Sequence, residues 1–148
     1  MFKKNSNEKS NDEDDQIKVY IRIRPMRNEF AKKTLKFIDH GVAFHYKDKK
    51  VNQLYFDEVF DETTSQQKLF DAAGLKIVTD VLNGNNGSLF VYGQTGTGKT
   101  YTMGTLETIK REDQGLIPLS LNYILNHLST TKNKDEWSVC ISFMQIYM

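Results

Sequence analysis

Hydrophobic and polar residues alternate along the first part of the chain in the period-2 pattern of β-strands. Residues 17–23 place isoleucine and valine at every second position, and Pro25 ends this strand. Residues 35–46 and 51–60 predict two further short strands, joined by the polar turn at residues 47–50. The order in which these strands pair cannot be derived from the pattern.

The second half of the chain changes to helical spacing. Thr64 and Gln67 have the spacing of a capping box at a helix start, and an apolar stripe continues to Leu82, formed by Leu69, Phe70, Ala73, Ile77, Val78 and Val81. Pro118 suits the first turn of a second helix, and residues 88–92 and 137–148 predict apolar, buried strands. Because helices alternate with strands here, we expect an α/β fold with a mixed central sheet flanked by helices.

Residues 88–104, SLFVYGQTGTGKTYTMG, carry the most specific motif in the sequence. They match the phosphate-binding P-loop, G-x-x-x-x-G-K-[ST], with the cradle formed by Gly93, Gln94, Thr95, Gly96, Thr97, Gly98, Lys99 and Thr100. Glycines let the backbone N–H groups approach a polyphosphate, helped by the positive end of the following helix. Lys99 can reach the β- and γ-phosphates, and the Thr100 hydroxyl can complete the shell of a Mg²⁺ ion. The alternative is a glycine-rich turn of purely structural use.

Composition narrows the classes of protein. The 148 residues have a formal net charge of +1, which argues against a broad nucleic-acid footprint. No run approaches the roughly 20 apolar residues that span a bilayer, so no membrane partner is expected. Cys140 is the single cysteine, which excludes an internal disulfide, and its apolar setting predicts a buried thiol. We therefore expect a cytoplasmic protein, whose polar residues 1–15 form a disordered leader.

Three segments, in this order, resemble the N-terminal part of a kinesin motor domain. They are IRIRP at residues 21–25, FDEVF at residues 56–60, and NNGSLFVYGQTGTGKTYTMG at residues 85–104. Weaker similarity continues in GLIP and in ISFMQIYM at the end of the chain, whose QIYM is similar to armadillo-repeat kinesins. The resemblance covers residues 16–148 and implies an α/β P-loop NTPase fold.

The resemblance also implies partners and further site residues. Arg22 and Pro25 would border the adenine of ATP, and Tyr101 would stack on its ring, since a phenol offers a flat apolar face. The cofactors would be ATP and Mg²⁺, the partner would be tubulin in microtubules, and the location would be the cytoskeleton. Without the resemblance, Arg22 is a solvated strand residue, Pro25 a strand stop and Tyr101 ordinary helix packing.

The resemblance accounts for only the first part of a motor domain. The kinesin switch I sequence, N-x-x-S-S-R-S-H, and the switch II sequence, D-x-x-G-x-E, do not occur in the 148 residues. We therefore expect a fragment that neither hydrolyses ATP at a motor's rate nor folds alone as a stable monomer. Two alternatives remain, a non-catalytic nucleotide-binding or tubulin-binding remnant and an unrelated P-loop nucleotide kinase.

Overall fold

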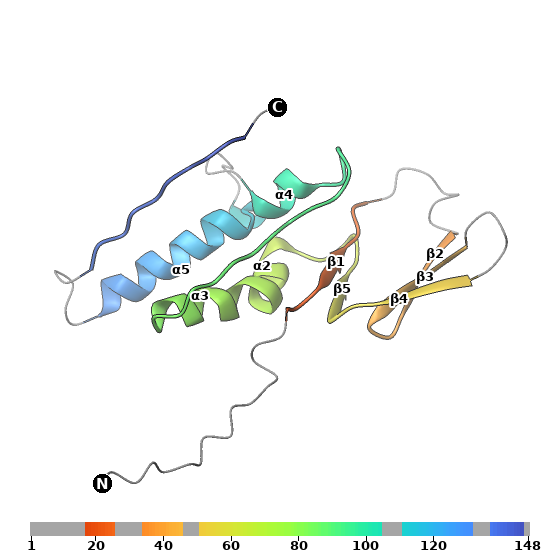
Figure 1. Cartoon of the computed structure of the whole chain (residues 1–148), viewed down its shortest axis with the longest axis horizontal. Helices are drawn as coiled ribbons and strands as arrows, with labels where there is room; N and C mark the ends of the chain where they lie inside the picture. Colours follow the sequence, from red (N-terminus) through yellow and green to blue (C-terminus); the bar gives the residue numbers. More distant parts are fainter. Residues whose placement is uncertain (1–16, 26–33, 46–50, 105–110, 132–136, 147–148) are drawn as a thin grey trace, which may run out of the picture. The chain divides into compact units, whose positions relative to one another are not determined.

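The structure, a computed structural model, describes residues 17–25, 34–45, 51–104, 111–131 and 137–146 (Figure 1). The chain divides into two compact units, Met1–Glu62 and Thr63–Met148, and each is described by itself. Residues 1–16, which include the expected leader, lie outside the described part. The boundary predicted at residue 16 therefore stays a prediction.

A parallel strand pair opens the first unit. Strand β1 (Tyr20–Arg22) pairs with β5 (Glu58–Phe60), and the rings of Tyr20 and Phe60 stack with their centroids 5.9 Å apart. Phe60 is almost fully buried, whereas Ile17 is 89% exposed. The predicted strand at residues 17–23 is therefore confirmed only in its second half, where a partner strand is present.

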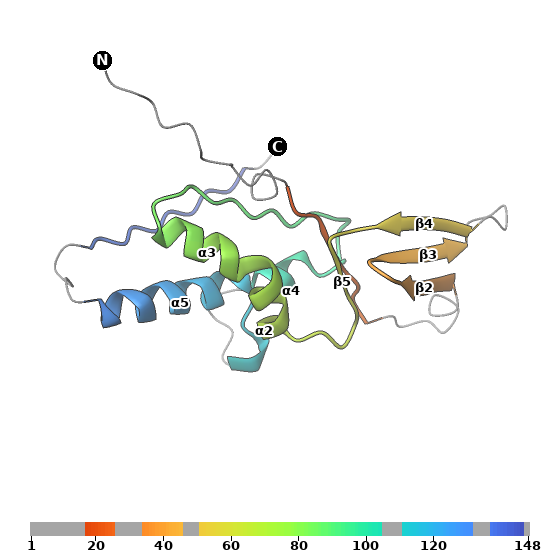
Figure 2. The ribbon, with the colours of Figure 1, turned by 90° about the horizontal axis from the view of Figure 1, so that it is seen from below.

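Three antiparallel strands form the second sheet of this unit, namely β2 (Leu35–Ile38), β3 (Gly41–His45) and β4 (Val51–Tyr55) (Figure 2). The prediction of two continuous strands at residues 35–46 and 51–60 is wrong. The first reverses direction at a tight turn over Asp39 and His40, where His40 adopts a positive φ of 49°. The second breaks after β4, because its last residues pair with β1 rather than with β3.

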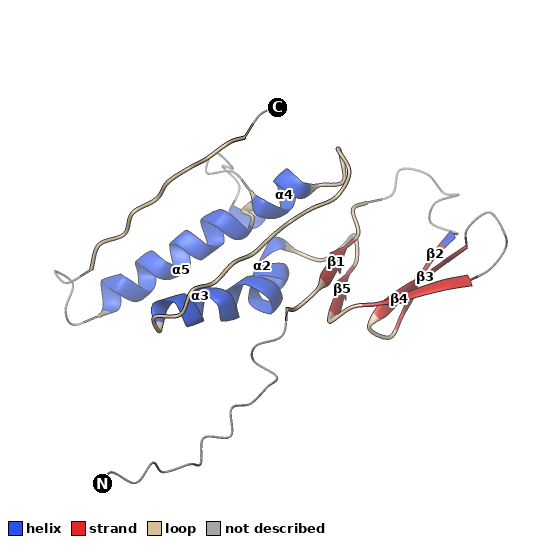
Figure 3. Cartoon of the chain, in the orientation of Figure 1, coloured by secondary structure: helices blue, strands red, loops and turns tan. Residues whose placement is uncertain are grey.

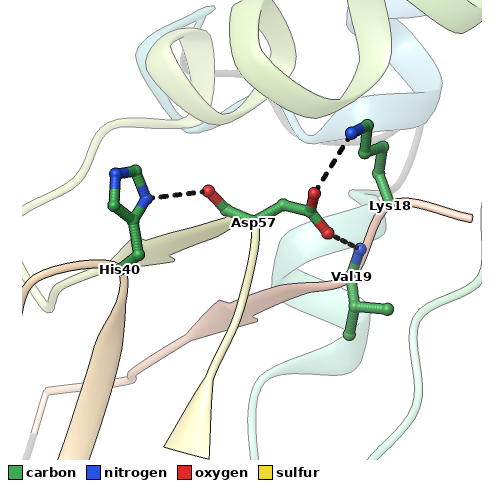
Figure 4. Close-up of polar contacts among 4 residues, drawn as sticks. All are labelled: Lys18, Val19, His40 and Asp57. Carbon is green, nitrogen blue, oxygen red and sulfur yellow. Dashed lines mark hydrogen bonds and ion pairs between the residues drawn. The ribbon is translucent and has the colours of Figure 1, made fainter. Parts of the chain in front are cut away.

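Asp57 fixes this break between β4 and β5 (Figure 4). Its carboxylate accepts a hydrogen bond of 2.7 Å from the Val19 backbone N–H and lies 3.3 Å from the ammonium of Lys18. The Val19 hydrogen bond, more than the Lys18 charge, holds the pKa of Asp57 below its ordinary value of 3.8. The Asp57 carbonyl oxygen lies 3.2 Å from Nδ1 of His40. One residue therefore joins the start of β1 to the turn between β2 and β3.

The second unit starts with one continuous helical stretch made of α2 (Gln66–Leu69), the π-helical turn η1 (Phe70–Gly74) and α3 (Leu75–Leu82). The predicted capping box is wrong in its residues. Ser65, not Thr64, is the N-cap, and its hydroxyl accepts from the Lys68 N–H at 3.1 Å. The Gln67 amide instead donates to Asp71 at 2.8 Å, which is one turn further along the helix.

The π-helical turn packs against the long helix α5 (Leu116–Thr130). Gly74 is buried there, and a Cβ at this position would lie 2.8 Å from the Phe70 ring. This close packing explains a glycine inside a helix, where it costs about 1 kcal/mol relative to alanine. Pro118 lies in the first turn of α5, so the predicted second helix is confirmed. The core of this unit comprises Leu69, Phe70, Ala73, Val78 and Leu116.

Two apolar segments predicted as buried strands are not strands in the structure. Residues 88–92 and 137–146 have no ladder partner among the described residues and are drawn as loop in Figure 3, and residues 147–148 of the second prediction lie outside the described part. Phe90 and Phe143 are 85% and 75% exposed, and Cys140 is exposed rather than buried. The prediction is wrong because an apolar pattern becomes a strand only when a neighbour supplies hydrogen bonds. No helix in the described ranges has the length and apolar character needed to cross a bilayer.

Candidate functional site

The predicted cradle is a loop that opens the short helix α4 (Lys99–Met103). Gly98 forms the N-cap of this helix with φ of 102°, a left-handed conformation that side chains rarely adopt. At the other end of the loop, a Cβ on Gly93 would lie only 2.8 Å from the Thr97 hydroxyl oxygen. The two glycines therefore permit a tight turn of the backbone.

The Lys99 side chain folds back into this loop. Its Nζ donates hydrogen bonds of 2.9 Å to the backbone carbonyls of both Gly93 and Gln94. The Thr97 hydroxyl donates to the same Gln94 carbonyl at 2.8 Å. The loop thus holds the Lys99 ammonium through two carbonyl contacts, and Gln94 and Thr97 also bond to each other within the loop.

A hollow of about 320 Å³ lies beside the loop, within the lower range of small-ligand sites. It is lined by Thr95, Gly96, Gly98, Lys99, Thr100 and Tyr101. The structure therefore brings together six of the predicted site residues from one contiguous stretch. Tyr101 is 52% exposed, so part of its ring is open to a ligand.

Arg22 and Pro25 belong to the other unit. Arg22 is the last residue of β1 and is half-buried, and Pro25 follows as an exposed residue. Their predicted position beside the adenine remains a prediction.

Sequence reasoning missed Gln66, the first residue of α2. This side chain is 2% exposed, and its amide Nε2 donates to the Tyr101 carbonyl at 2.6 Å. A sign of its importance was available, because Gln66 stands three and four residues before Leu69 and Phe70, on the apolar stripe of the helix. A polar residue on such a stripe is expected to be buried with hydrogen-bond partners.

The chemistry of this site is that of anion binding. The described ranges contain no group of three or more histidine, cysteine, aspartate or glutamate side chains placed to hold a metal ion. A single ammonium in a loop rich in backbone N–H groups instead favours a polyphosphate. A metal ion would then bind to the phosphates and to one hydroxyl of the loop. The loop, the lysine and the following helix have the sequence and the arrangement typical of the P-loop motif.

Comparison with known proteins identifies the family. The family model for the kinesin motor domain matches residues 3–148, so this chain belongs to the kinesin motor domain family. It is 38% identical over 140 residues to the kinesin heavy chain of Drosophila melanogaster, which covers 91% of this chain. The predicted fold class, the α/β fold of P-loop NTPases, is confirmed. The alternative of an unrelated nucleotide kinase is wrong.

Two solved structures of Drosophila NOD have similar folds. One, with manganese and ADP bound, has a TM-score of 0.67, and the other, docked with bovine tubulin into a map of nucleotide-free NOD on the microtubule, has 0.68. Both are 27% identical to this chain and cover 81% of it. The chain spans 40% of the NOD chain and 14% of the Drosophila kinesin heavy chain.

Proposed function

We propose that residues 93–101 bind ATP with Mg²⁺ and that this chain forms the ATP-binding part of a kinesin-like microtubule motor. The observation that carries the proposal is the Lys99 ammonium, which two loop carbonyls hold at 2.9 Å beside the hollow. A related structure, that of NOD, contains a divalent metal ion and ADP. The residues of the loop fit this type of ligand, since glycine leaves the approach to the backbone open.

Lys99, Thr100 and Tyr101 have distinct roles in this proposal. Lys99 exchanges its carbonyl partners for β- and γ-phosphate oxygens, and the Thr100 hydroxyl contributes one oxygen to the metal shell. When bound, Mg²⁺ neutralises negative charge on the phosphates. Tyr101 covers one face of the adenine, and the role of Arg22 and Pro25 beside the base stays a prediction from the family resemblance. The partner is the microtubule, and the place of action is the cytoskeleton in the cytoplasm.

The metal dependence of ATP binding tests this proposal. In the full-length protein, ATP affinity is measured by titration with Mg²⁺ and with EDTA for the parent, Thr100→Ala and Thr79→Ala. Thr79 is the matched control, because it lies in α3 and its hydroxyl donates to the Leu75 carbonyl. We expect Thr100→Ala to reduce the gain in affinity from Mg²⁺ about tenfold, equivalent to about 1.4 kcal/mol, while Thr79→Ala retains it.

Two results would contradict the proposal at different points. A parent protein that does not bind ATP refutes the nucleotide site as a whole. A parent that binds ATP while Thr100→Ala keeps the full magnesium effect refutes only the assignment of Thr100 to the metal.

A further inference from the structure

Gln66 is a buried polar residue in the core of the second unit. Its side chain is 2% exposed, although it stands at the first position of α2, where glutamine is ordinarily solvated. A buried amide is costly unless its hydrogen-bonding groups find partners. The partners of Gln66 therefore show what this residue stabilises.

The Gln66 amide joins two segments that are distant in the sequence. Its Nε2 donates to the Tyr101 carbonyl of α4 at 2.6 Å and to the Asp113 carbonyl of the turn η2 (Arg111–Asp113) at 3.3 Å. A glutamine amide nitrogen carries two hydrogens, so one side chain can satisfy both carbonyls. Gln66 thereby links the helix of the P-loop to α2 and to the segment that precedes α5.

Helix α4 depends on such support because it has only five residues. An isolated helix of this length is unstable in water. Its Thr100 carbonyl accepts from the Gly104 N–H, and its Tyr101 carbonyl accepts from the Gln66 amide. At the end of α4, Gly104 lies against Gly115, where a Cβ would approach the Gly115 nitrogen to 2.6 Å. The helix is thus held by α2 through Gln66 and by the start of α5 through this glycine contact.

We infer that Gln66 is a positioning residue of the nucleotide site, which holds α4 so that Lys99, Thr100 and Tyr101 face the ligand together. The inference rests on the proposed function of the P-loop. Without the Gln66 amide, α4 frays in the free protein, and the nucleotide must order it on binding. The apparent dissociation constant then rises in inverse proportion to the fraction of molecules whose helix is formed.

The test compares Gln66→Met and Gln66→Glu with the control Gln67→Met in the full-length protein. Methionine keeps the length of the side chain and loses its donors. Glutamate keeps the shape, has no donor while its carboxyl is ionised, and regains one donor when the carboxyl is protonated in acid. Gln67 is the exposed neighbour, and its amide donates to the Asp71 carboxylate at 2.8 Å.

Two measurements separate positioning from general stability. The first is ATP affinity, which we expect to fall about tenfold in both Gln66 variants, as it would if about one molecule in ten kept α4 formed. The second is hydrogen exchange of the Thr102 and Gly104 amides, which donate to the Gly98 and Thr100 carbonyls at 2.9 Å and 2.8 Å. In the Gln66 variants, hydrogen exchange should be faster than in the parent at these two amides but not in α3 or α5. Saturating ATP should return the exchange rate to that of the parent.

Lowering the pH provides a further check. The ATP affinity of Gln66→Glu should recover toward that of the parent as the carboxyl becomes protonated, whereas that of Gln66→Met should not. The inference is overturned by unchanged affinity and unchanged α4 exchange in both Gln66 variants, or by equally faster exchange throughout the second unit, which would indicate a merely structural role. Failure of the parent to bind ATP would refute the proposed function, and α4 exchange would still decide whether Gln66 holds the helix.

Discussion

Replacing Lys99 with alanine removes the one cation that lines the hollow in the described part of the chain. In the free protein, its ammonium is satisfied by the carbonyls of Gly93 and Gln94, at 2.9 Å each. In the nucleotide complex, these two hydrogen bonds are exchanged for bonds to phosphate oxygens, which carry full negative charge. The net contribution to binding is therefore the difference between charged and neutral acceptors, and not the sum of all contacts.

The magnitude follows from the charge of the new acceptors. The Coulomb attraction between two unit charges about 4 Å apart is about 1 kcal/mol in water and about 4 kcal/mol at the effective dielectric of a protein surface. We expect a net loss on the order of 2.7 kcal/mol in Lys99→Ala, within this range, which corresponds to about 100-fold weaker binding. At an ATP concentration of about 100 times the parent's dissociation constant, ATP stabilises the parent by about 2.7 kcal/mol and the variant by only about 0.4 kcal/mol.

Thermal unfolding with and without Mg-ATP measures this difference. The matched control is Lys76→Ala, because Lys76 lies on α3 and forms an ion pair with Asp80 at 3.1 Å. Loss of such an exposed pair costs about 0.3–0.5 kcal/mol and should leave the ATP-induced shift intact. A shift in Lys99→Ala as large as that of the parent would refute the reasoning, and so would an equal loss of the shift in Lys76→Ala.

Two further predictions concern Tyr101 and Asp57. Tyr101→Ala should weaken ATP binding by about 1 kcal/mol or more, while Tyr101→His, which keeps a flat ring, should bind as the parent does; equal affinities of Tyr101→Ala and the parent in a titration would exclude stacking. Because the pKa of Asp57 is lowered in the folded state, its carboxylate stabilises the fold above the ordinary value of 3.8, and this contribution is lost as the pH falls through the lowered pKa. Denaturant unfolding should therefore show a stability gap between the parent and Asp57→Asn that closes in acid, and a gap independent of pH would contradict the role of the charge.

The parts that could be predicted from the sequence depend on neighbours in the sequence. The cradle is one contiguous stretch whose glycines and lysine are each required by the same local geometry, so its spacing identifies it. Helix α5 could be predicted for a similar reason. Its proline lies in the first turn, and its apolar residues recur at helical spacing. In both cases the structure adds distances and burial but changes no assignment.

The parts that could not be predicted depend on contacts between distant residues. The FDEVF pattern predicts Asp57 as a strand residue, yet its carboxylate accepts a hydrogen bond from the Val19 N–H, 38 residues earlier. Gln66 stands on the apolar stripe of its helix, which indicates burial, but its partner, the Tyr101 carbonyl of α4, comes 35 residues later. Hydropathy cannot encode such partners.

The apolar segments at residues 88–92 and 137–146 show the same limit from the opposite side. Both contain valine and aromatic side chains, and the second also contains isoleucine, which are residue types that favour a sheet. A strand, however, is a pair of backbones, and within the described ranges neither segment has a partner for its N–H and C=O groups. The exposed rings of Phe90, Tyr92 and Phe143 follow from this missing partner rather than from any polar character of the sequence. Because residues 88–92 lead directly into the P-loop, any strand that paired with this segment would also fix the start of the loop that holds Lys99.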